Sequence, residues 1–210
     1  MDELELLKKD WNKQETPSLS FDQIYRILLK KSSSIVKWIF YISIFELLLA
    51  LVATAWFMFD DTYDKIEIEG YDIDAITLAF EAISMIVLVY FMFRFFNNYK
   101  KITVTDDSRT LMKNILKTRK IVKNYIKIAL LIAAVYTAIL LFIGTFNAPF
   151  FVEKVNGSDS VLILYIAASI VILVVTAVII VALWLVYQLL YGLLLRRLER
   201  NYKELQQLDI

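Results

Sequence analysis

Four long stretches of apolar residues constrain the fold of this chain more than any other feature. They run from about Ile35 to Phe59, Ile73 to Phe96, Ile126 to Phe146 and Val161 to Leu195. A helix needs about 20 apolar residues to cross the ~30 Å hydrocarbon layer of a bilayer, and each stretch reaches that length. We therefore predict an all-α, polytopic membrane protein with four transmembrane helices.

The stretches divide the chain into five parts. We expect a helical cytoplasmic tail over residues 1–34, a transmembrane hairpin over 35–97, a basic helical loop over 98–125, a second transmembrane hairpin over 126–195, and a helical cytoplasmic tail over 196–210. The fourth stretch would be ~52 Å long as a helix, which exceeds the bilayer thickness. Its inner part is expected to pack against cytoplasmic helices, and Trp184, Tyr187 and Tyr191 there are typical of an aromatic girdle.

Lysine and arginine are distributed unevenly along the chain. Of 23 such residues, 21 precede or begin the first stretch, lie between the second and third or at their adjoining ends, or follow the fourth; Lys65 and Lys154 are the exceptions. The positive-inside rule then predicts a multi-pass protein of the bacterial inner (cytoplasmic) membrane with both termini in the cytoplasm. The polar, mixed-charge start does not resemble a signal peptide, so the first stretch is expected to act as an uncleaved insertion signal.

The residue types that are absent narrow the function. The chain has no cysteine and no histidine, which removes thiolate nucleophiles, histidine-based triads and the usual zinc and haem sites. The acidic segment between the first two stretches could hold Ca²⁺, but its spacing does not match an EF-hand, and a solvated loop is the simpler interpretation. We predict no enzymatic activity, no cofactor and no metal site. A net charge of +1 and the lack of a reader motif argue against a nucleic-acid partner.

Two carboxylates lie inside the apolar stretches. Glu46 is near the middle of the first, and Glu81 is about two turns inside the outer end of the second. An ionisable residue at such a depth marks a functional site by default, here a proton or cation site facing a cavity. The alternative for Glu46 is a neutral carboxyl that hydrogen-bonds to a neighbouring helix, for example to Thr137 or Tyr136; for Glu81 it is packing or snorkelling. A depth difference of ~10 Å argues against a carboxylate pair.

Several segments outside the apolar stretches are amphipathic. A basic set, which either contacts anionic lipid or a partner or only sets the topology, comprises Lys113, Lys117, Lys120 and Lys127. Apolar stripes in the two tails comprise Leu4, Leu7 and Trp11, and Leu198, Tyr202 and Leu205. Such stripes need a partner, which for the C-terminal tail is either the chain's own middle helix or a second copy. Partners are therefore the lipid bilayer and either a protein partner or a homo-oligomer.

The two predicted hairpins resemble each other. Lys31-Ser32 and Ile35-Val36-Lys37 match Lys117-Thr118 and Ile121-Val122-Lys123 at one offset, and Asn98-Tyr99-Lys100 matches Asn201-Tyr202-Lys203 at the hairpin ends. Both units run in the same sense, which is the pattern of parallel repeats about an axis along the membrane normal. Short matches also arise by chance in lysine-rich helices, so duplication and coincidence both stay open.

Two segments, 6–14 and 30–38, resemble a group of uncharacterised small four-helix integral membrane proteins of Bacteroidota. Some of that group carry the label beta-carotene monooxygenase, which names a β-propeller with histidine-bound iron. This chain has no histidine, so we reject that label. Members of that group are similar in being encoded near alternative sigma factors. The resemblance therefore implies an anti-sigma-like role, although no residue here supports it.

Two functional hypotheses follow. The first is a non-enzymatic membrane scaffold or regulator that acts through its cytoplasmic helices by protein–protein interaction. The alternative is a small transporter or channel subunit that uses intramembrane Glu46.

Overall fold

The computed structural model describes residues 21–59, 68, 70–103 and 108–208, which are almost entirely helical. The first hairpin consists of α2 (Phe21–Phe59) and α3 (Ile73–Thr103). The second consists of α4 (Ser108–Phe146) and α6 (Val161–Tyr187), joined by the short α5 (Pro149–Asn156). A π-helical segment, η1 (Gln188–Gly192), continues α6 into α7 (Leu193–Leu208).

Local sequence explains where these helices begin and continue. α2 has 39 residues, none of them proline or glycine, so nothing in its backbone interrupts the helix. α3 begins where the Asp72 carboxylate accepts a hydrogen bond from the Ala75 amide at 2.8 Å, a typical N-cap. Pro149 occupies the first turn of α5, where its missing N–H costs nothing.

Among the described residues, four helices are long and apolar enough to cross a membrane. The prediction of an all-α chain with four such helices is confirmed. Two details differ from the sequence prediction. The segment between the third and fourth apolar stretches contains α5, and the fourth stretch is not one uniform α-helix because η1 interrupts it.

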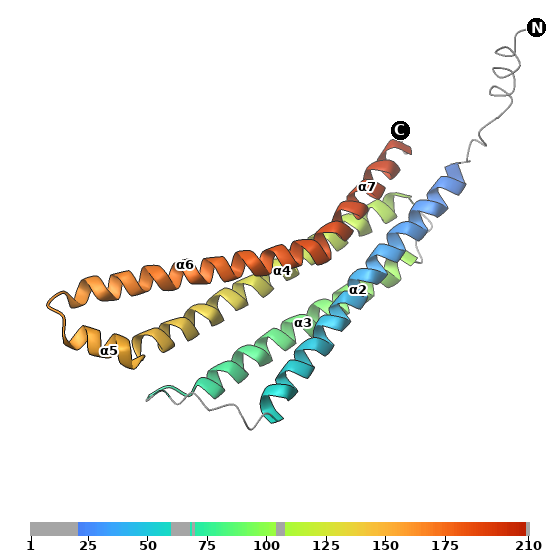
Figure 1. The fold of residues 1–210 in the computed structure, drawn as a ribbon. Coiled ribbons are helices and arrows are strands. Elements are labelled where there is room, and N and C mark those ends of the chain that lie inside the picture. The colour runs from blue at the N-terminus through green and yellow to red at the C-terminus, as the bar shows by residue number, and fades with distance from the viewer. Residues whose placement is uncertain (1–20, 60–67, 69, 104–107, 209–210) are drawn as a thin grey trace, which may run out of the picture.

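The two hairpins pack together at one end and separate toward the other (Figure 1). α3 packs on α4, and both α2 and α4 pack on α7. We call the end where α7 lies the basic end, because exposed lysines such as Lys113 and Lys120 gather there. We call the opposite end, where α5 joins α4 to α6, the α5 end.

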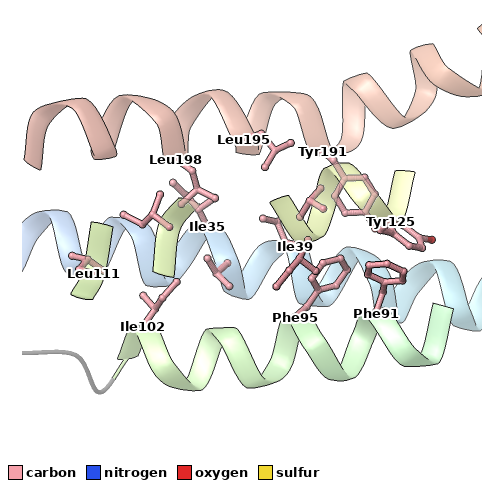
Figure 2. Packing of buried hydrophobic residues seen from close by; sticks show 14 of the residues in the cluster. Ile35, Ile39, Phe91, Phe95, Ile102, Leu111, Tyr125, Tyr191, Leu195 and Leu198 are labelled. Atoms are coloured by element: carbon pink, nitrogen blue, oxygen red, sulfur yellow. The ribbon is translucent and has the colours of Figure 1, made fainter. Parts of the chain in front are cut away.

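The buried core lies at the basic end (Figure 2). Its buried residues come from α2, α3, α4, η1 and α7 and include Val36 and Ile39 of α2, Phe95 of α3, Val122 of α4 and Leu198 of α7. Each of these side chains is at most 1% exposed. The basic end is therefore a packed four-helix bundle, whereas most large apolar side chains of α6 are exposed, as expected for a surface that faces lipid.

Two buried asparagines bridge the hairpins within this core. Asn98 of α3 donates a hydrogen bond to the Thr118 hydroxyl of α4. Asn201 of α7 donates one to the Ser32 hydroxyl of α2 at 3.2 Å. All four side chains are buried, so each contact satisfies polar groups that have no access to water.

Candidate functional site

The candidate site is built around Glu46, which lies midway along α2. The Tyr187 hydroxyl donates to its Oε1 at 2.6 Å, and the Tyr191 hydroxyl donates to its Oε2 at 3.2 Å. Both donors are therefore aimed at one carboxylate across the interface between the hairpins. Each oxygen of the Glu46 carboxyl group therefore accepts a hydrogen bond from a tyrosine of the other hairpin.

A third tyrosine completes the cluster. Tyr125 of α4 lies with its ring centroid 6.1 Å from Tyr187 and 6.0 Å from Tyr191, in edge-to-face geometry with both. Figure 2 shows Tyr125 and Tyr191 close together at one end of the buried core. Tyr125 is 2% exposed and Tyr191 is fully buried, so both rings are packed within the bundle beside Glu46.

The π-helical segment carries part of this site. Tyr187 ends α6 and Tyr191 lies in η1, and their rings stack with centroids 6.1 Å apart. A π-turn inserts an extra residue, which rotates everything beyond it by about 100° relative to a continuous α-helix. The spacing of Tyr187, Tyr191, Leu198 and Leu205 follows the 3.6-residue period, and Leu198 and Leu205 are buried in the core while the tyrosine hydroxyls reach Glu46.

Glu46 and Glu81 line one cavity between the helices. The cavity has a volume of about 380 Å³ and is lined by residues of α2, α3 and α4, with Tyr187 as the lining residue from α6. Thr54 of α2 donates to Glu81 Oε2 at 3.4 Å. Because Thr54 lies two turns beyond Glu46, Glu81 lies about 12 Å closer to the α5 end. The two carboxylates thus share a cavity without forming a pair, and the shared cavity was not predicted from the sequence.

Glu46 does hydrogen-bond to a neighbouring helix, as one of its two interpretations expected, but through Tyr187 and Tyr191 rather than the examples Thr137 and Tyr136. Neither Thr137 nor Tyr136 binds it; the Tyr136 hydroxyl instead donates to Thr77 of α3 at 3.3 Å. The interpretation of Tyr187 and Tyr191 as a membrane-interface girdle also fails, because their hydroxyls face the bundle interior. The sequence did carry one signal for this contact. Tyr187 and Tyr191 are four residues apart in an otherwise apolar stretch, so their hydroxyls lie on one face of the helix and can reach the same polar group.

The basic residues of the middle segment lie on the surface of α4. Lys113, Lys117, Lys120 and Lys127 are all exposed. The opposite face of the same helix is buried, with Leu111 and Ile115 fully covered. These lysines are therefore accessible to a ligand, but no cavity that we describe contains them.

The apolar stripe of the C-terminal tail packs within its own chain. Leu198 and Leu205 are at most 1% exposed, and Tyr202 is half-buried, as α7 packs on α2 and α4. Of the two partners expected for this stripe, the chain's own middle helix, α4, is one that it contacts, together with α2, so Leu198 and Leu205 are not left for a contact with another molecule. The N-terminal stripe, Leu4, Leu7 and Trp11, lies outside the described residues.

Within the described ranges, no group of three or more acidic, cysteine or histidine side chains could hold a metal ion. Most of the acidic segment before α3 lies outside those ranges.

The fold and the site together define a class: a helical chain with four helices of membrane-spanning length and a carboxylate-lined cavity between them. The chain belongs to the family described as "Domain of unknown function (DUF8845)", which matches residues 22–210. No curated protein and no solved structure matches it.

Proposed function

We propose that this chain is a small integral membrane transporter or channel subunit. The cavity between its hairpins forms part of the solute path, and Glu46 is the charged group that the solute meets. The observation that carries this proposal is that Glu46 lines a cavity of about 380 Å³ and accepts hydrogen bonds there from two tyrosine hydroxyls. Intramembrane carboxylates that face a cavity are typical of ion and substrate pathways.

A purely structural role for Glu46 is the competing explanation. Two hydroxyl donors are enough to stabilise a carboxyl group between helices, and a structural role needs nothing more. The structural role does not account for the cavity beside Glu46 or for the second carboxylate, Glu81, that lines it. These two features favour the transport proposal.

Flux measurements test the proposal. The full chain is reconstituted into liposomes that contain a pH-sensitive dye, and flux is followed under an imposed proton, Na⁺ or K⁺ gradient. We expect a flux that Glu46→Gln abolishes. Glu153→Gln is the matched control, because Glu153 lies exposed on α5, away from the cavity. A flux that survives Glu46→Gln, or no flux with any of these cations, counts against the proposal.

We also propose that the basic end faces the cytoplasm of a bacterium, with both termini there and the protein in the inner membrane. The support is the location of 21 of the 23 lysines and arginines. The chain has no cysteine, so single introduced cysteines can be labelled selectively. Lys113→Cys should resist an impermeant maleimide in intact spheroplasts, whereas Asp159→Cys at the α5 end should react. The opposite labelling pattern would invert the topology.

We further propose that the two hairpins arose by duplication as parallel repeats. The crossed asparagine contacts support this, because Ser32 and Thr118 occupy matching positions in the two hairpins, as do Asn98 and Asn201. In each contact the asparagine of one unit binds the hydroxyl of the other. A two-fold axis between the units produces such a reciprocal pattern.

The scaffold or regulator hypothesis, with its anti-sigma-like variant, has less support. It was motivated by apolar stripes without partners, and the stripes of α4 and α7 are buried within this chain. What is left is the N-terminal stripe of Leu4, Leu7 and Trp11. If a variant lacking residues 1–20 retains every protein that co-purifies with the full chain from native membranes, this hypothesis loses its remaining basis.

A further inference from the structure

We infer that the cavity binds a lipophilic organic cation, such as a quaternary ammonium or phosphonium ion, with its charge near Glu46 and its apolar groups against aromatic rings. This inference rests on the proposed function and specifies the class of solute. A binding site for such a cation needs a negative counter-charge, aromatic rings, sufficient volume and a route of entry.

The aromatic rings lie where such a cation would need them. Tyr125 and Tyr187 line the cavity beside Glu46, and Phe80 and Tyr136 line it toward the α5 end, with their ring centroids 5.2 Å apart. The face of an aromatic ring attracts a cation, and the attraction is larger when water is excluded. An organic cation would therefore find aromatic rings and a carboxylate at each end of the cavity, with Glu46 toward the basic end and Glu81 toward the α5 end.

The walls between the two ends are made of small side chains. Ala50 and Ala53 of α2 and Ala129 and Ala133 of α4 all line the cavity. These four short side chains leave a volume of about 380 Å³, within the range of about 300–1,000 Å³ typical of pockets for small organic molecules. A bound proton would need no such volume.

A bare divalent cation fits this cavity poorly. Ca²⁺ takes six to eight oxygen ligands at about 2.3–2.6 Å, and Mg²⁺ requires an octahedral set. Glu46 and Glu81 are too far apart to bind the same ion, and no larger cluster of metal ligands occurs in the described part of the chain. A delocalised organic charge needs only one counter-charge when apolar contacts supply the remaining affinity.

The packing of the helices leaves a route of entry from the bilayer. α2 packs on α3 and α7, and α6 packs on α4, but α2 and α6 are not among the described helix pairs with extensive contact. The hairpins separate toward the α5 end, as Figure 1 shows. A lipophilic cation that partitions into the bilayer could thus reach the cavity laterally, between α2 and α6.

Equilibrium dialysis with radiolabelled tetraphenylphosphonium tests the inference on the full chain in a mild non-ionic detergent. We expect saturable binding that neutral triphenylphosphine oxide does not displace. Glu46→Gln should weaken binding at least about tenfold, because it removes the counter-charge. Tyr187→Leu should weaken it about 2- to 30-fold through loss of a ring face, whereas Tyr187→Phe, which keeps the ring, should weaken it less.

A second variant guards against misfolding of the charge variant. Ala133→Phe fills the cavity while leaving Glu46 and its tyrosines in place, and should weaken binding at least about tenfold. Ala167→Phe on the exposed face of α6 is its matched control and should bind as the unaltered chain does. Gel-filtration elution and helical content identify any variant that has lost its fold.

The outcomes separate this inference from the proposed function. Tetraphenylphosphonium that fails to bind while a Glu46-dependent proton or Na⁺ flux is present overturns the inference and leaves the transport proposal standing. Binding that depends on Glu46 and on an open cavity, without any protein-dependent flux of tetraphenylphosphonium, protons, Na⁺ or K⁺ into liposomes, supports the inference and overturns transport. Binding that neither Glu46→Gln nor Ala133→Phe weakens overturns the inference, because the ion then binds elsewhere.

Discussion

Removing the Ser32 hydroxyl probes the contact that joins α2 to α7. Ser32 is fully buried and accepts a hydrogen bond from Asn201 Nδ2 at 3.2 Å, and Asn201 is 2% exposed. Ser32→Ala leaves the buried amide donor without its partner. We expect this to lower the free energy of unfolding by about 1–3 kcal/mol, the cost of an unsatisfied buried polar group.

The reciprocal change should cost less. Asn201→Leu removes the amide but keeps a side chain of similar size in the core, and the Ser32 hydroxyl can then bond to a carbonyl in its own helix. We expect a loss of about 1 kcal/mol. The double variant should be more stable than the sum of the single effects indicates, with a coupling energy of about 0.6–1.7 kcal/mol, between the average and the maximum found for hydrogen bonds between transmembrane helices.

Unfolding in mixed micelles, driven by increasing SDS and followed by far-ultraviolet circular dichroism, supplies the four free energies of this cycle. The equivalent cycle with Thr118→Ala and Asn98→Leu should give a coupling of similar size if the hairpins are repeats. Ser32→Ala combined with Ile163→Ala, at the start of α6, is the additive control. Purely additive effects in the Ser32–Asn201 cycle would refute the reasoning, because the two side chains would then contribute independently.

Three further predictions concern the basic end. Leu198→Ala should lower the free energy of unfolding by about 2–5 kcal/mol in the same assay, because Leu198 is fully buried. Leu193→Ala, at a position 53% exposed, should change it little. Equal losses in the two variants would contradict the packing described. Deleting Leu189, which is exposed in η1, should convert the π-helix to α-helix and destabilise the chain more than Leu189→Ala does. Equal destabilisation by the deletion and the substitution would mean that the residue added by the π-helix has no structural role. Glu199→Gln should lower the free energy of unfolding by at most about 1 kcal/mol, because it removes the 3.0 Å ion pair with Arg119. This loss of stability should become smaller in high salt. A loss that does not depend on salt would indicate an effect on packing instead.

The helices could be predicted because each depends on a contiguous segment. A run of about 20 apolar residues has one solution in a bilayer, a helix, and α2, α3, α4 and α6 all follow from such runs. The depth of Glu46 followed from its position within its own run. α5 was missed because it is only 8 residues long and has no long apolar run.

The partners of Glu46 could not be predicted in the same way. Tyr187 lies 141 residues from Glu46 in the sequence, and the contact depends on how two hairpins are rotated against each other. Helical periodicity indicated that Tyr187 and Tyr191 share a face, but not whether that face meets lipid or another helix. The π-helical segment could not be predicted either, because no residue type specifies it in advance.

The sequence by itself determined the lengths of the apolar helices, the presence of a carboxylate within two of them, and the separation of basic from acidic segments. These properties are sums over neighbouring residues, so they need no knowledge of the rest of the chain. Only the tertiary structure decided that Glu46 and Glu81 line one cavity, that the tyrosine hydroxyls face Glu46, and that the asparagines cross between hairpins. Each of those facts depends on the crossing and rotation of helices, which long-range packing fixes and local composition does not.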